Sequence, residues 1–190
     1  MRHGQTVFNE LRIVQGFCDS PLTELGRRQP LYAKRWFEYR NIKFDHAYTS
    51  TQERASDTLE LVTDLPYVRL KGIKEMNFGT FEGKASHLLH QEVNLMEDPT
   101  AMIKFGGESM YAVQSRVVNA LTEVMSKDDH QTVIAVSHAC AVFTFAHKWI
   151  PDLKWDQIRM TNCCILQFEY EDGKFKLIEA VTHDFDQPLE

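Results

Sequence analysis

The run Arg2-His3-Gly4 near the start of the chain has residue types that suit chemistry on a phosphate group. Arginine is permanently charged, and its planar fork of donors matches phosphate oxygens. Histidine can react through one ring nitrogen while a hydrogen bond to the other fixes its tautomer. Glycine lets the backbone approach a ligand closely. The run predicts a histidine nucleophile for phosphorus, and so short a motif gains weight only from matching parts elsewhere.

A second histidine, His138, follows the apolar, β-branched run Thr132–Val136. Such a run is typical of a strand buried on both faces. Ligands of open α/β sheets collect at the carboxyl ends of strands. We therefore expect His3 and His138 to share a site at one edge of a sheet, although His138 taken alone is equally compatible with a structural role.

Two further charged residues lie at positions where a ligand would explain them. Arg54 lies in the first turn of a predicted helix, where the dipole disfavours a cation but a bound phosphate would use both the guanidinium and the free amides. The alternative is a surface arginine paired with Glu53 or Asp57. Glu75 lies in a glycine-bearing loop beside aromatic residues, where burial raises the pKa of a carboxyl group and suits it to donate a proton. The alternative is a solvated acidic loop.

Strands and helices alternate in the segments that must position these residues, which predicts an α/β fold with a mostly parallel sheet. Pro30 falls inside the first helical pattern and predicts a kink or break there. The predicted helices cover residues 23–40, 52–64, 84–95, 109–125 and 140–149. The predicted strands cover 47–49, 67–70 and 132–136, with a hairpin at 163–170 and 175–181, and with loops at 4–22, 71–83 and 97–107.

Composition limits the classes of partner. The chain has 190 residues and a formal net charge of −6, which argues against general affinity for nucleic acid or an anionic membrane. An apolar run near the roughly 20 residues needed to span a bilayer is absent, and no signal peptide is visible. We expect a cytoplasmic protein, a monomer or a homodimer, whose four cysteines are reduced thiols.

His87 and His90 form an HxxH pair without the glutamate of an HExxH zinc motif. Histidines three residues apart on a helix are more often a solvated surface than a metal site. We therefore expect no metal.

The motifs occur in one order along the chain, and together they resemble the histidine phosphatase superfamily in its phosphoglycerate-mutase-like branch. The resemblance reaches from residue 2 to at least His138, and Asn162 also fits it. It implies a three-layer α/β/α sandwich in a single domain over residues 1–190, with a small cap around residues 84–107. The segments that carry it are Arg2–Thr6 with Asn9, Gln15–Gly26, Ser50–Thr58, Glu75–Gly83, Gly107–Ser109 and Ser137–His138.

The resemblance also implies residue roles in a metal-free reaction without a cofactor. His3 would form a phosphohistidine, and Glu75 would exchange protons with the leaving group and water. Three cationic or donor side chains would hold the phosphoryl oxygens: Arg2, Arg54 and His138. Further ligand contacts would come from Asn9, from amides near Gln15 and Gly16, and from Ala139.

Phosphatase and mutase are both compatible with such a site. Mutases of this branch carry an arginine pair in a longer insertion, whereas residues 84–106 here hold Lys84 and Lys104 but no arginine. We therefore expect a phosphomonoesterase for small phosphorylated metabolites, with a cofactor-dependent phosphoglycerate mutase as the alternative. A catalytically dead binding protein and an exported acid phosphatase are rival classes. Two departures stand out: only Met1 precedes Arg2, and Ala139 replaces a glycine common in the family.

Overall fold

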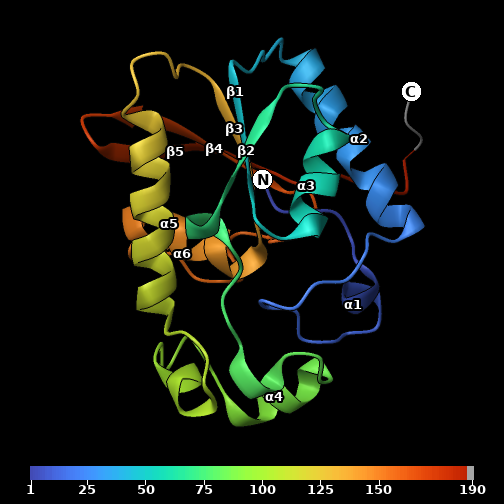
Figure 1. The fold of residues 1–190 in the computed structure, drawn as a ribbon, viewed down its shortest axis with the longest axis vertical. Helices are drawn as coiled ribbons and strands as arrows, with labels where there is room; N and C mark the ends of the chain where they lie inside the picture. The colour runs from blue at the N-terminus through green and yellow to red at the C-terminus, as the bar shows by residue number, and fades with distance from the viewer. Residues whose placement is uncertain (188–190) are drawn as a thin grey trace.

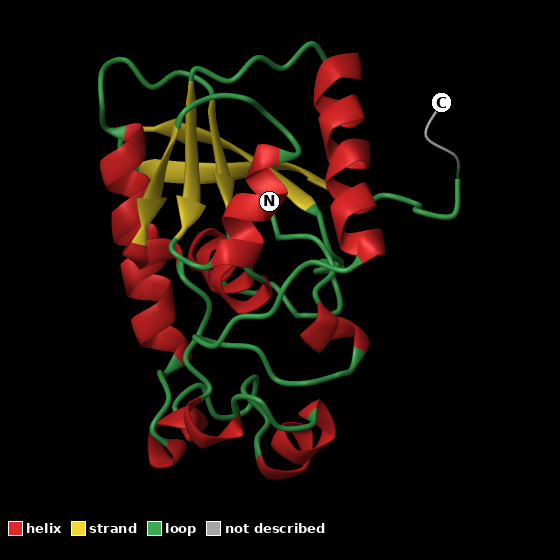
Figure 2. Ribbon diagram, turned by 45° about the vertical axis from the view of Figure 1, so that its right-hand side comes forward, coloured by secondary structure: helices red, strands yellow, loops and turns green. Residues whose placement is uncertain are grey.

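A parallel sheet at the centre of the molecule positions the predicted site. In the computed structural model, which describes residues 1–187, strands β1 (His46–Ser50), β2 (Tyr67–Leu70) and β3 (Val133–Val136) pair in the order β2-β1-β3. Both pairings are parallel, with Ala47 opposite Tyr67 on one side and Ile134 on the other. The carboxyl ends of the three strands therefore lie along one edge, which faces α1 and α4 (Figure 2).

Helices cover both faces of this sheet, so the predicted three-layer arrangement is confirmed (Figure 1). Helices α2 (Glu24–Tyr39) and α3 (Glu53–Glu60) lie on one face, and α5 (Met110–Met125) and α6 (Ala139–Trp149) lie on the other. The alternation of β3 explains both layers, because successive side chains of a strand point to opposite faces. Ile134 and Val136 pack with α2 and α3, while Ala135 packs against the cluster that includes α5 and α6.

The last two strands form the predicted hairpin. Strands β4 (Ile165–Glu171) and β5 (Lys174–Val181) pair antiparallel. The connecting residues Asp172 and Gly173 both have positive φ, at 49° and 77°, which two-residue hairpin turns with Asp-Gly favour. Phe168 and Phe175 pack against Phe145 of α6, so α6 covers the hairpin as well as the three-stranded sheet.

Residues Met1–His3 lie between β3 and the start of β4. The N–H of Arg2 donates to the carbonyl of Cys164 at 3.0 Å, and the N–H of His3 donates to the carbonyl of Ser137, also at 3.0 Å. A cavity of about 310 Å³ is lined by Met1 and by residues of β3 and β4. The amino group of Met1 donates to the carbonyl of Ala135 at 2.8 Å, so the backbone that leads into His3 is held by β3 on one side and by the start of β4 on the other.

Several element boundaries differ from those that the sequence predicts. A short helix α1 (Val7–Glu10) interrupts the expected 4–22 loop, with Thr6 as its N-cap. Helix α2 continues through Pro30 without a break. Proline cannot donate to the carbonyl four residues earlier, and here that carbonyl belongs to Gly26 and lies against Gly4, where a Cβ would come within 2.3 Å of it. The lost hydrogen bond is thus accommodated at a close contact between loop and helix.

The 84–107 segment lies apart from the sheet, beyond its carboxyl edge. It contains helix α4 (Ser86–Glu92) and the 3-10 helix η3 (Ala101–Phe105), which replaces part of an expected loop. Two further 3-10 helices, η1 (Lys71–Ile73) and η2 (Gly79–Phe81), interrupt the predicted 71–83 loop. Across residues 1–187, the helices are too short or too polar to cross a membrane.

Candidate active site

The predicted catalytic residues converge at the carboxyl edge of the sheet. Ser50 ends β1, His138 directly follows β3 and Ser137, and Arg54 lies in the first turn of α3. The rings of His3 and His138 are 5.1 Å apart between centroids. Four charged or titratable side chains are almost completely buried, with exposed fractions of 0–5%: His3, Arg54, Glu75 and His138. Burial of charged or titratable side chains costs free energy, so four of them together indicate a functional site.

His3 is held with one ring nitrogen bonded and the other available. Its Nδ1 lies 2.7 Å from the carbonyl oxygen of Gly4. A carbonyl only accepts, so Nδ1 carries the proton and Nε2 keeps its lone pair. The carbonyl of His3 accepts from Cys163 N–H at 3.2 Å and from Asn162 Nδ2 at 3.1 Å. These bonds fix both the backbone and the tautomer that a nucleophilic imidazole requires.

His138 is the neutral partner of Arg54. The Nε–H of Arg54 donates to Nδ1 of His138 at 3.1 Å, so the remaining proton of the ring lies on Nε2 and donates to Ser50 Oγ at 2.6 Å. Burial lowers the pKa of His138 well below the ordinary value, and the Arg54 charge lowers it further. The pKa of His3 is lowered well below its ordinary value by burial first, and then by Arg54 and Arg2. Both imidazoles are therefore neutral at pH 7 in the free protein.

The charge of Arg54 is compensated by the loop 16–19, not by its helix neighbours. Its Nη1 contacts Asp19 Oδ1 at 2.7 Å and donates to the carbonyl of Cys18 at 3.0 Å. Its Nη2 donates to the carbonyl of Gly16 at 3.0 Å. The alternative pairing of Arg54 with Glu53 or Asp57 is therefore wrong. A guanidinium with these partners is fixed in place between the loop 16–19 and His138.

Glu75 caps the helix that follows His138. Its carboxylate accepts from the N–H groups of Cys140 and Ala141, at 3.2 and 3.1 Å, and from its neighbour Met76 at 2.8 Å. A carboxylate is favoured at a helix N-terminus by the free N–H groups and by the dipole. Burial nevertheless raises the pKa of Glu75, with these amides acting in the opposite direction. The first N–H of α6, that of Ala139, is left outside this cap.

The other predicted contact residues line the loops around His3. Asn9 Oδ1 accepts from Thr6 N–H and from Asn162 Nδ2, both at 3.2 Å, so no bond within residues 1–187 uses its Nδ2. Arg2 donates to the carbonyl of Met160 through Nη1, while its buried Nε has no partner in the described part of the chain. Asn9 Nδ2 and Arg2 Nε are therefore donors for which residues 1–187 supply no acceptor.

Gln15 and Gly16 lie in the loop but use their groups differently. The side chain of Gln15 accepts from Thr6 Oγ1 at 2.6 Å and donates to Ser20 Oγ at 3.1 Å, which leaves only its backbone for a ligand. The carbonyl of Gly16 faces Arg54, and a Cβ at Gly16 would come within 2.3 Å of a Glu82 oxygen. Glycine is thus required here for close approach. Ala139 is the first residue of α6 and adopts no positive φ, so alanine fits where the family often has glycine.

Two positioning groups are visible only in the structure. Gln52 donates to the carbonyl of Gly16 at 2.5 Å and accepts from the N–H of Glu75 at 2.9 Å, so it joins two loops of the site. Arg116 of α5 donates to the carbonyl of Glu75 at 2.8 Å and forms a double hydrogen bond with Glu108, both at 2.9 Å. The Gly107–Ser109 motif therefore holds the Glu75 loop from behind. In the sequence, only the position of Glu108 inside a recognised motif hinted at this role.

The arrangement is suited to hold a tetrahedral anion next to a nucleophilic nitrogen. A neutral His3 Nε2 lies beside Arg54 and His138, with further donors on Arg2, Asn9 and the start of α6. A parallel α/β sandwich with this constellation at its carboxyl edge defines a class of phosphoryl-transfer fold related to phosphoglycerate mutases.

Comparison with known proteins gives the family. The sequence model of the histidine phosphatase superfamily (branch 1) matches residues 1–182, and the chain belongs to this superfamily. A curated relative, the probable phosphoglycerate mutase GpmB of Yersinia pestis (strain Pestoides F), is 28% identical over 184 residues, which cover 91% of this chain and 84% of the relative.

Two solved structures share the fold over nearly the whole chain. YhfR of Bacillus stearothermophilus is similar with a TM-score of 0.77 and 28% identity, covering 93% of this chain and 92% of that one. A phosphoserine phosphatase from Entamoeba histolytica, in complex with 3-phosphoglyceric acid, has a TM-score of 0.79 at 23% identity, covering 97% and 95%. At that identity the second likeness concerns the fold alone.

Proposed function

We propose that the protein is a phosphomonoesterase that hydrolyses small organic phosphates through a phosphohistidine at His3. The observation that carries this proposal is the buried, neutral His3 whose Nδ1–H is committed to the Gly4 carbonyl at 2.7 Å, beside the Arg54–His138 pair. An imidazole with one fixed nitrogen and one free lone pair is a nucleophile.

The first half of the reaction transfers the phosphoryl group to His3. The lone pair of His3 Nε2 attacks phosphorus, a P–N bond forms and the P–O bond to the leaving group breaks. Glu75 supplies the proton that the leaving oxygen takes, and the raised pKa of its carboxyl group supports this role. In the second half, water attacks the phosphohistidine, Glu75 accepts the proton of that water, and the P–N bond breaks to release phosphate and neutral His3.

The phosphoryl oxygens replace the internal acceptors that now occupy the donors. The Nε–H group of Arg54 would exchange its acceptor, from His138 Nδ1 to a phosphoryl oxygen. His138 would then take up a proton from solvent water on Nδ1 and direct that N–H to a second phosphoryl oxygen. Arg2 Nε, Asn9 Nδ2 and the N–H of Ala139 supply the remaining donors. Charge spread over three oxygens is stabilised most by donors that are already in place.

The positive charge for this step comes from the protein, so the proposed reaction needs neither metal nor cofactor. Two guanidiniums act where magnesium ions act in kinases. A chelator such as EDTA is expected to leave the hydrolysis rate unchanged. A rate that falls with chelation and returns with one specific metal would contradict this part of the proposal.

We propose phosphatase rather than mutase activity because of the segment beyond the sheet edge. Residues 84–107 are proposed to form a cap, tied to the site at its base by Val14 N–H donating to the Lys84 carbonyl at 2.8 Å. This segment contains Lys84 and Lys104 but no arginine pair to hold a substrate carboxylate. The likeness to GpmB keeps the cofactor-dependent mutase as the second candidate.

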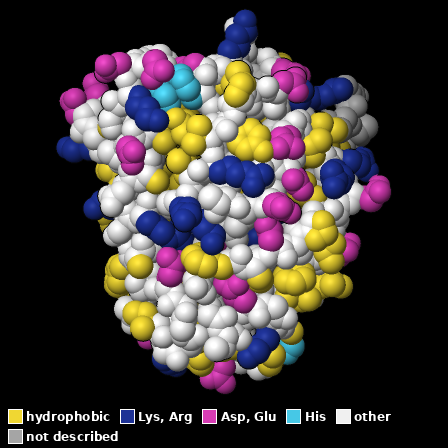
Figure 3. Space-filling model, in the orientation of Figure 1, with side chains coloured by type: hydrophobic (Ala, Val, Ile, Leu, Met, Phe, Trp, Pro, Cys, Tyr) yellow, Lys and Arg dark blue, Asp and Glu magenta, His cyan; other side chains and the backbone are white. Residues whose placement is uncertain are grey.

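The proposed substrate is a small phosphorylated metabolite. The face shown in Figure 3 has Lys and Arg side chains across its middle with Asp and Glu among them. Mixed signs and a net charge of −6 do not favour a nucleic acid partner. The cysteines of the chain, Cys18, Cys140, Cys163 and Cys164, are free thiols in the structure, which supports the cytoplasm as the compartment.

The experiment that tests the proposed function is capture of the intermediate. The protein is mixed with an aryl phosphate, quenched in alkali and digested, and the peptide that contains His3 is weighed by mass spectrometry. We expect one added phosphoryl group on His3, absent in His3→Ala. Turnover by the folded His3→Ala variant, or a phosphoryl group on another residue, would overturn the proposal.

The role of Glu75 is tested by varying the leaving group. An acidic aryl alcohol leaves without protonation, whereas an alkyl alcohol needs a proton. Glu75→Gln is therefore expected to lower phosphorylation of His3 far more with an alkyl phosphate than with a nitrophenyl phosphate. Equal losses with both would assign Glu75 a structural role at the start of α6.

The mutase alternative is decided on one set of substrates. Phosphoserine, 3-phosphoglycerate and sugar phosphates are assayed for released phosphate, and 2-phosphoglycerate formation from 3-phosphoglycerate is measured in parallel with and without a bisphosphoglycerate. Phosphate release without interconversion supports the phosphatase. Interconversion faster than release would assign the mutase activity.

A further inference from the structure

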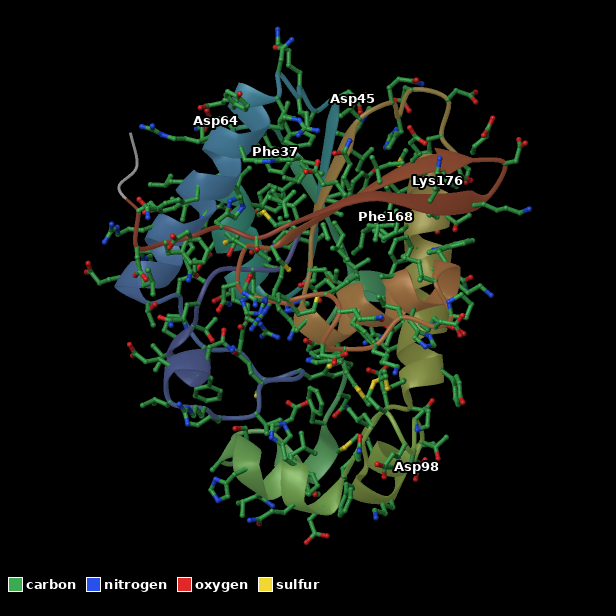
Figure 4. All side chains as sticks on the ribbon, turned by 180° about the vertical axis from the view of Figure 1, so that it is seen from behind. Phe37, Asp45, Asp64, Asp98, Phe168 and Lys176 are labelled. Carbon is green, nitrogen blue, oxygen red and sulfur yellow. The ribbon has the colours of Figure 1, made fainter. Side chains whose placement is uncertain are left out.

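A cluster of two histidines and two aspartates lies at the end of the sheet opposite to the candidate active site. His46 is the first residue of β1, and Asp129 and His130 lie in the connection from α5 to β3. Figure 4 labels Asp45 at this end and Asp98 at the far end of the molecule. The four-residue rise of β1 from His46 to Ser50 separates the cluster from the active-site edge by about 13 Å.

The side chains of His46, Asp129 and His130 converge on one point. His46 Nε2 lies 3.4 Å from Asp129 Oδ2, and His130 Nδ1 lies 2.7 Å from Asp129 Oδ1. The two imidazoles are stacked, with centroids 3.6 Å apart and an interplanar angle of 12°. Their nitrogens and the carboxylate oxygen all lie within 4.8 Å of one another. Two parallel rings thus direct one nitrogen each toward the same carboxylate.

The opposite nitrogen of each ring is also bonded. His46 Nδ1 lies 2.9 Å from Asp45 Oδ1, and His130 Nε2 lies 2.6 Å from the hydroxyl of Tyr48. Asp45 is itself fixed, because its Oδ2 accepts from the N–H groups of Gln131 and Thr132 at 2.9 and 2.7 Å. Histidines that bind a metal usually direct their other ring nitrogen to such an oxygen, which fixes the tautomer and the ring plane.

The protons of His46 do not suffice for its two carboxylate neighbours. A neutral imidazole has one N–H, and carboxylates only accept. If His46 donates through Nδ1 to Asp45, its Nε2 lone pair faces the Asp129 carboxylate. A positive charge between these two groups removes the repulsion, and either a second proton or a metal cation can supply it. The third candidate ligand atom, His130 Nδ1, lies against the same carboxylate, so a single metal ion placed there would contact all three side chains.

We propose that His46, His130 and Asp129 bind one late first-row transition metal ion, Zn²⁺ in the first instance. Two imidazole nitrogens with one carboxylate oxygen suit zinc better than magnesium or calcium, which prefer oxygen ligands. Asp129 is 73% exposed in its side chain, so water completes the coordination. When Nδ1 of His130 binds the ion, the ring proton lies on Nε2 and can donate to the hydroxyl of Tyr48.

The proposed metal ties the start of β1 to the connection that precedes β3. It is independent of the hydrolytic chemistry and does not involve the HxxH pair. His87 and His90 of that pair are exposed on α4. A ligand that binds only the folded chain raises its stability by mass action, so the metal is expected to raise the melting temperature without entering the reaction.

The test uses the tag-free chain, stripped with a chelator and transferred to phosphate-free buffer. Zn²⁺ is titrated in competition with a chromophoric chelator, and Co²⁺ is used as a spectroscopic probe. We expect one ion per chain, a visible Co²⁺ spectrum and a higher melting temperature. Asp129→Asn, at an exposed position, and His46→Gln, at a half-buried one, are expected to abolish this binding, and Asp45→Asn to weaken it about 10- to 100-fold.

The matched control is the double variant His87→Gln with His90→Gln, which removes two histidines outside the cluster and is expected to bind Zn²⁺ as the parent does. His130→Gln is less informative, since His130 is buried. Absence of saturable binding by the parent chain would overturn the proposal and assign the cluster to protons alone. Unchanged binding in both Asp129→Asn and His46→Gln would overturn it as well.

Discussion

The two ends of strands β1 and β3 carry similar side chains in opposite electrostatic surroundings. At the carboxyl ends, His138 accepts a hydrogen bond from the buried Arg54 at 3.1 Å. At the amino ends, His46 and His130 face the carboxylate of Asp129. Histidine side chains are therefore placed to bind an anion at one end of the sheet and a cation at the other.

The direction of the chain explains this difference. Helices α3 and α6 begin directly after β1 and β3, so their N-termini lie at the carboxyl edge of the sheet. Helices α2 and α5 end before the same two strands and bring their C-termini to the amino edge. Helix N-termini favour negative charge and C-termini favour positive charge. A parallel α/β sheet thus offers a phosphate site and a cation site on the same pair of strands.

The largest expected effect is that single substitutions at the two ends of the sheet abolish different activities, hydrolysis at one end and Zn²⁺ binding at the other. His3→Ala is expected to lower kcat/KM for an aryl phosphate by at least about a thousandfold, because it removes the attacking nitrogen, while Zn²⁺ binding stays unchanged. His46→Gln is expected to abolish Zn²⁺ binding and leave kcat/KM unchanged. Steady-state kinetics and the chelator competition measure both quantities on each variant.

The control for both substitutions is the far-ultraviolet circular dichroism and melting curve of each variant. A large loss of hydrolysis in folded His46→Gln would show that the two ends are coupled. A loss of Zn²⁺ binding in folded His3→Ala would show that the metal binds at the active site.

The sequence predicted one end of the sheet better than the other. Arg54, Glu75 and His138 could be identified because each lies in a motif at a strand or helix boundary, and parallel strands bring such boundaries to one edge. Asp19, the partner of Arg54, lies 35 residues away from it in the sequence. It belongs to the Gln15–Gly26 motif, but no role for it was predicted from the sequence. Arg116 lies 41 residues from Glu75, and no local pattern indicates such a contact.

The other features that the sequence did not predict also depend on contacts between residues far apart in the chain. The continuity of α2 at Pro30 depends on a contact between Gly26 and Gly4, which helix propensity does not contain. His46 and His130 are separated by a crossover and meet only because β1 pairs with β3 in register, with His46 opposite Val133. Local preferences gave the order of the elements and strand β2 with its bounds, while side-chain pairs between distant segments required the tertiary structure.

The second prediction concerns the buried charge at the carboxyl end. Asp19→Asn removes the negative partner of Arg54, whose side chain is fully buried. Discounted for the partial exposure of Asp19, the loss is expected to be about 1–3 kcal/mol in the free energy of unfolding. Inorganic phosphate is expected to stabilise the variant more than the parent, because the bound anion replaces the lost carboxylate. Thermal unfolding with and without phosphate measures this.

The matched variant for this comparison is Asp129→Asn at the other end of the sheet. It also removes one carboxylate beside cationic or titratable groups, and phosphate is expected to have the same effect on it as on the parent. Equal stabilisation of Asp19→Asn and the parent by phosphate would contradict an anion site at Arg54.

The third prediction is a pH dependence of stability that arises at the carboxyl end. The pKa values of His3 and His138 lie well below the ordinary value of 6.5 in the folded chain. The unfolded chain therefore binds more protons below that pH, and the free energy of unfolding falls as the pH decreases from about 7 toward 5. Each histidine contributes a slope of up to about 1.4 kcal/mol per pH unit.

Replacing one of these histidines isolates its share. His138→Gln retains an acceptor for Arg54 and a donor for Ser50, and it is expected to flatten the pH dependence in urea denaturation. The raised pKa of Glu75 acts in the opposite direction, since its protonated form is favoured in the folded chain as the pH falls. The exposed His87→Gln is the control. A slope in His138→Gln equal to that of the parent would show that His138 does not titrate on unfolding.

The smallest expected effect concerns exposed lysines at the two ends of the sheet and their influence on the KM of an anionic substrate. Lys74 precedes Glu75 and places its Nζ 3.5 Å from the ring centroid of Phe17, next to the loop that contacts Arg54. Lys74→Met is expected to raise KM for an anionic aryl phosphate by about two- to fivefold at low ionic strength, and less at high salt, because exposed charges are screened. Lys127→Met makes the same change of charge at the amino end of the sheet, beside Tyr48. Electrostatic attraction in solution decays within a Debye length, and Lys127 lies at the opposite end of the sheet from the candidate active site. Lys127→Met is therefore expected to leave KM unchanged. An equal increase of KM in both variants would mean that the net charge of the protein, and not a charge at the carboxyl edge, attracts the substrate.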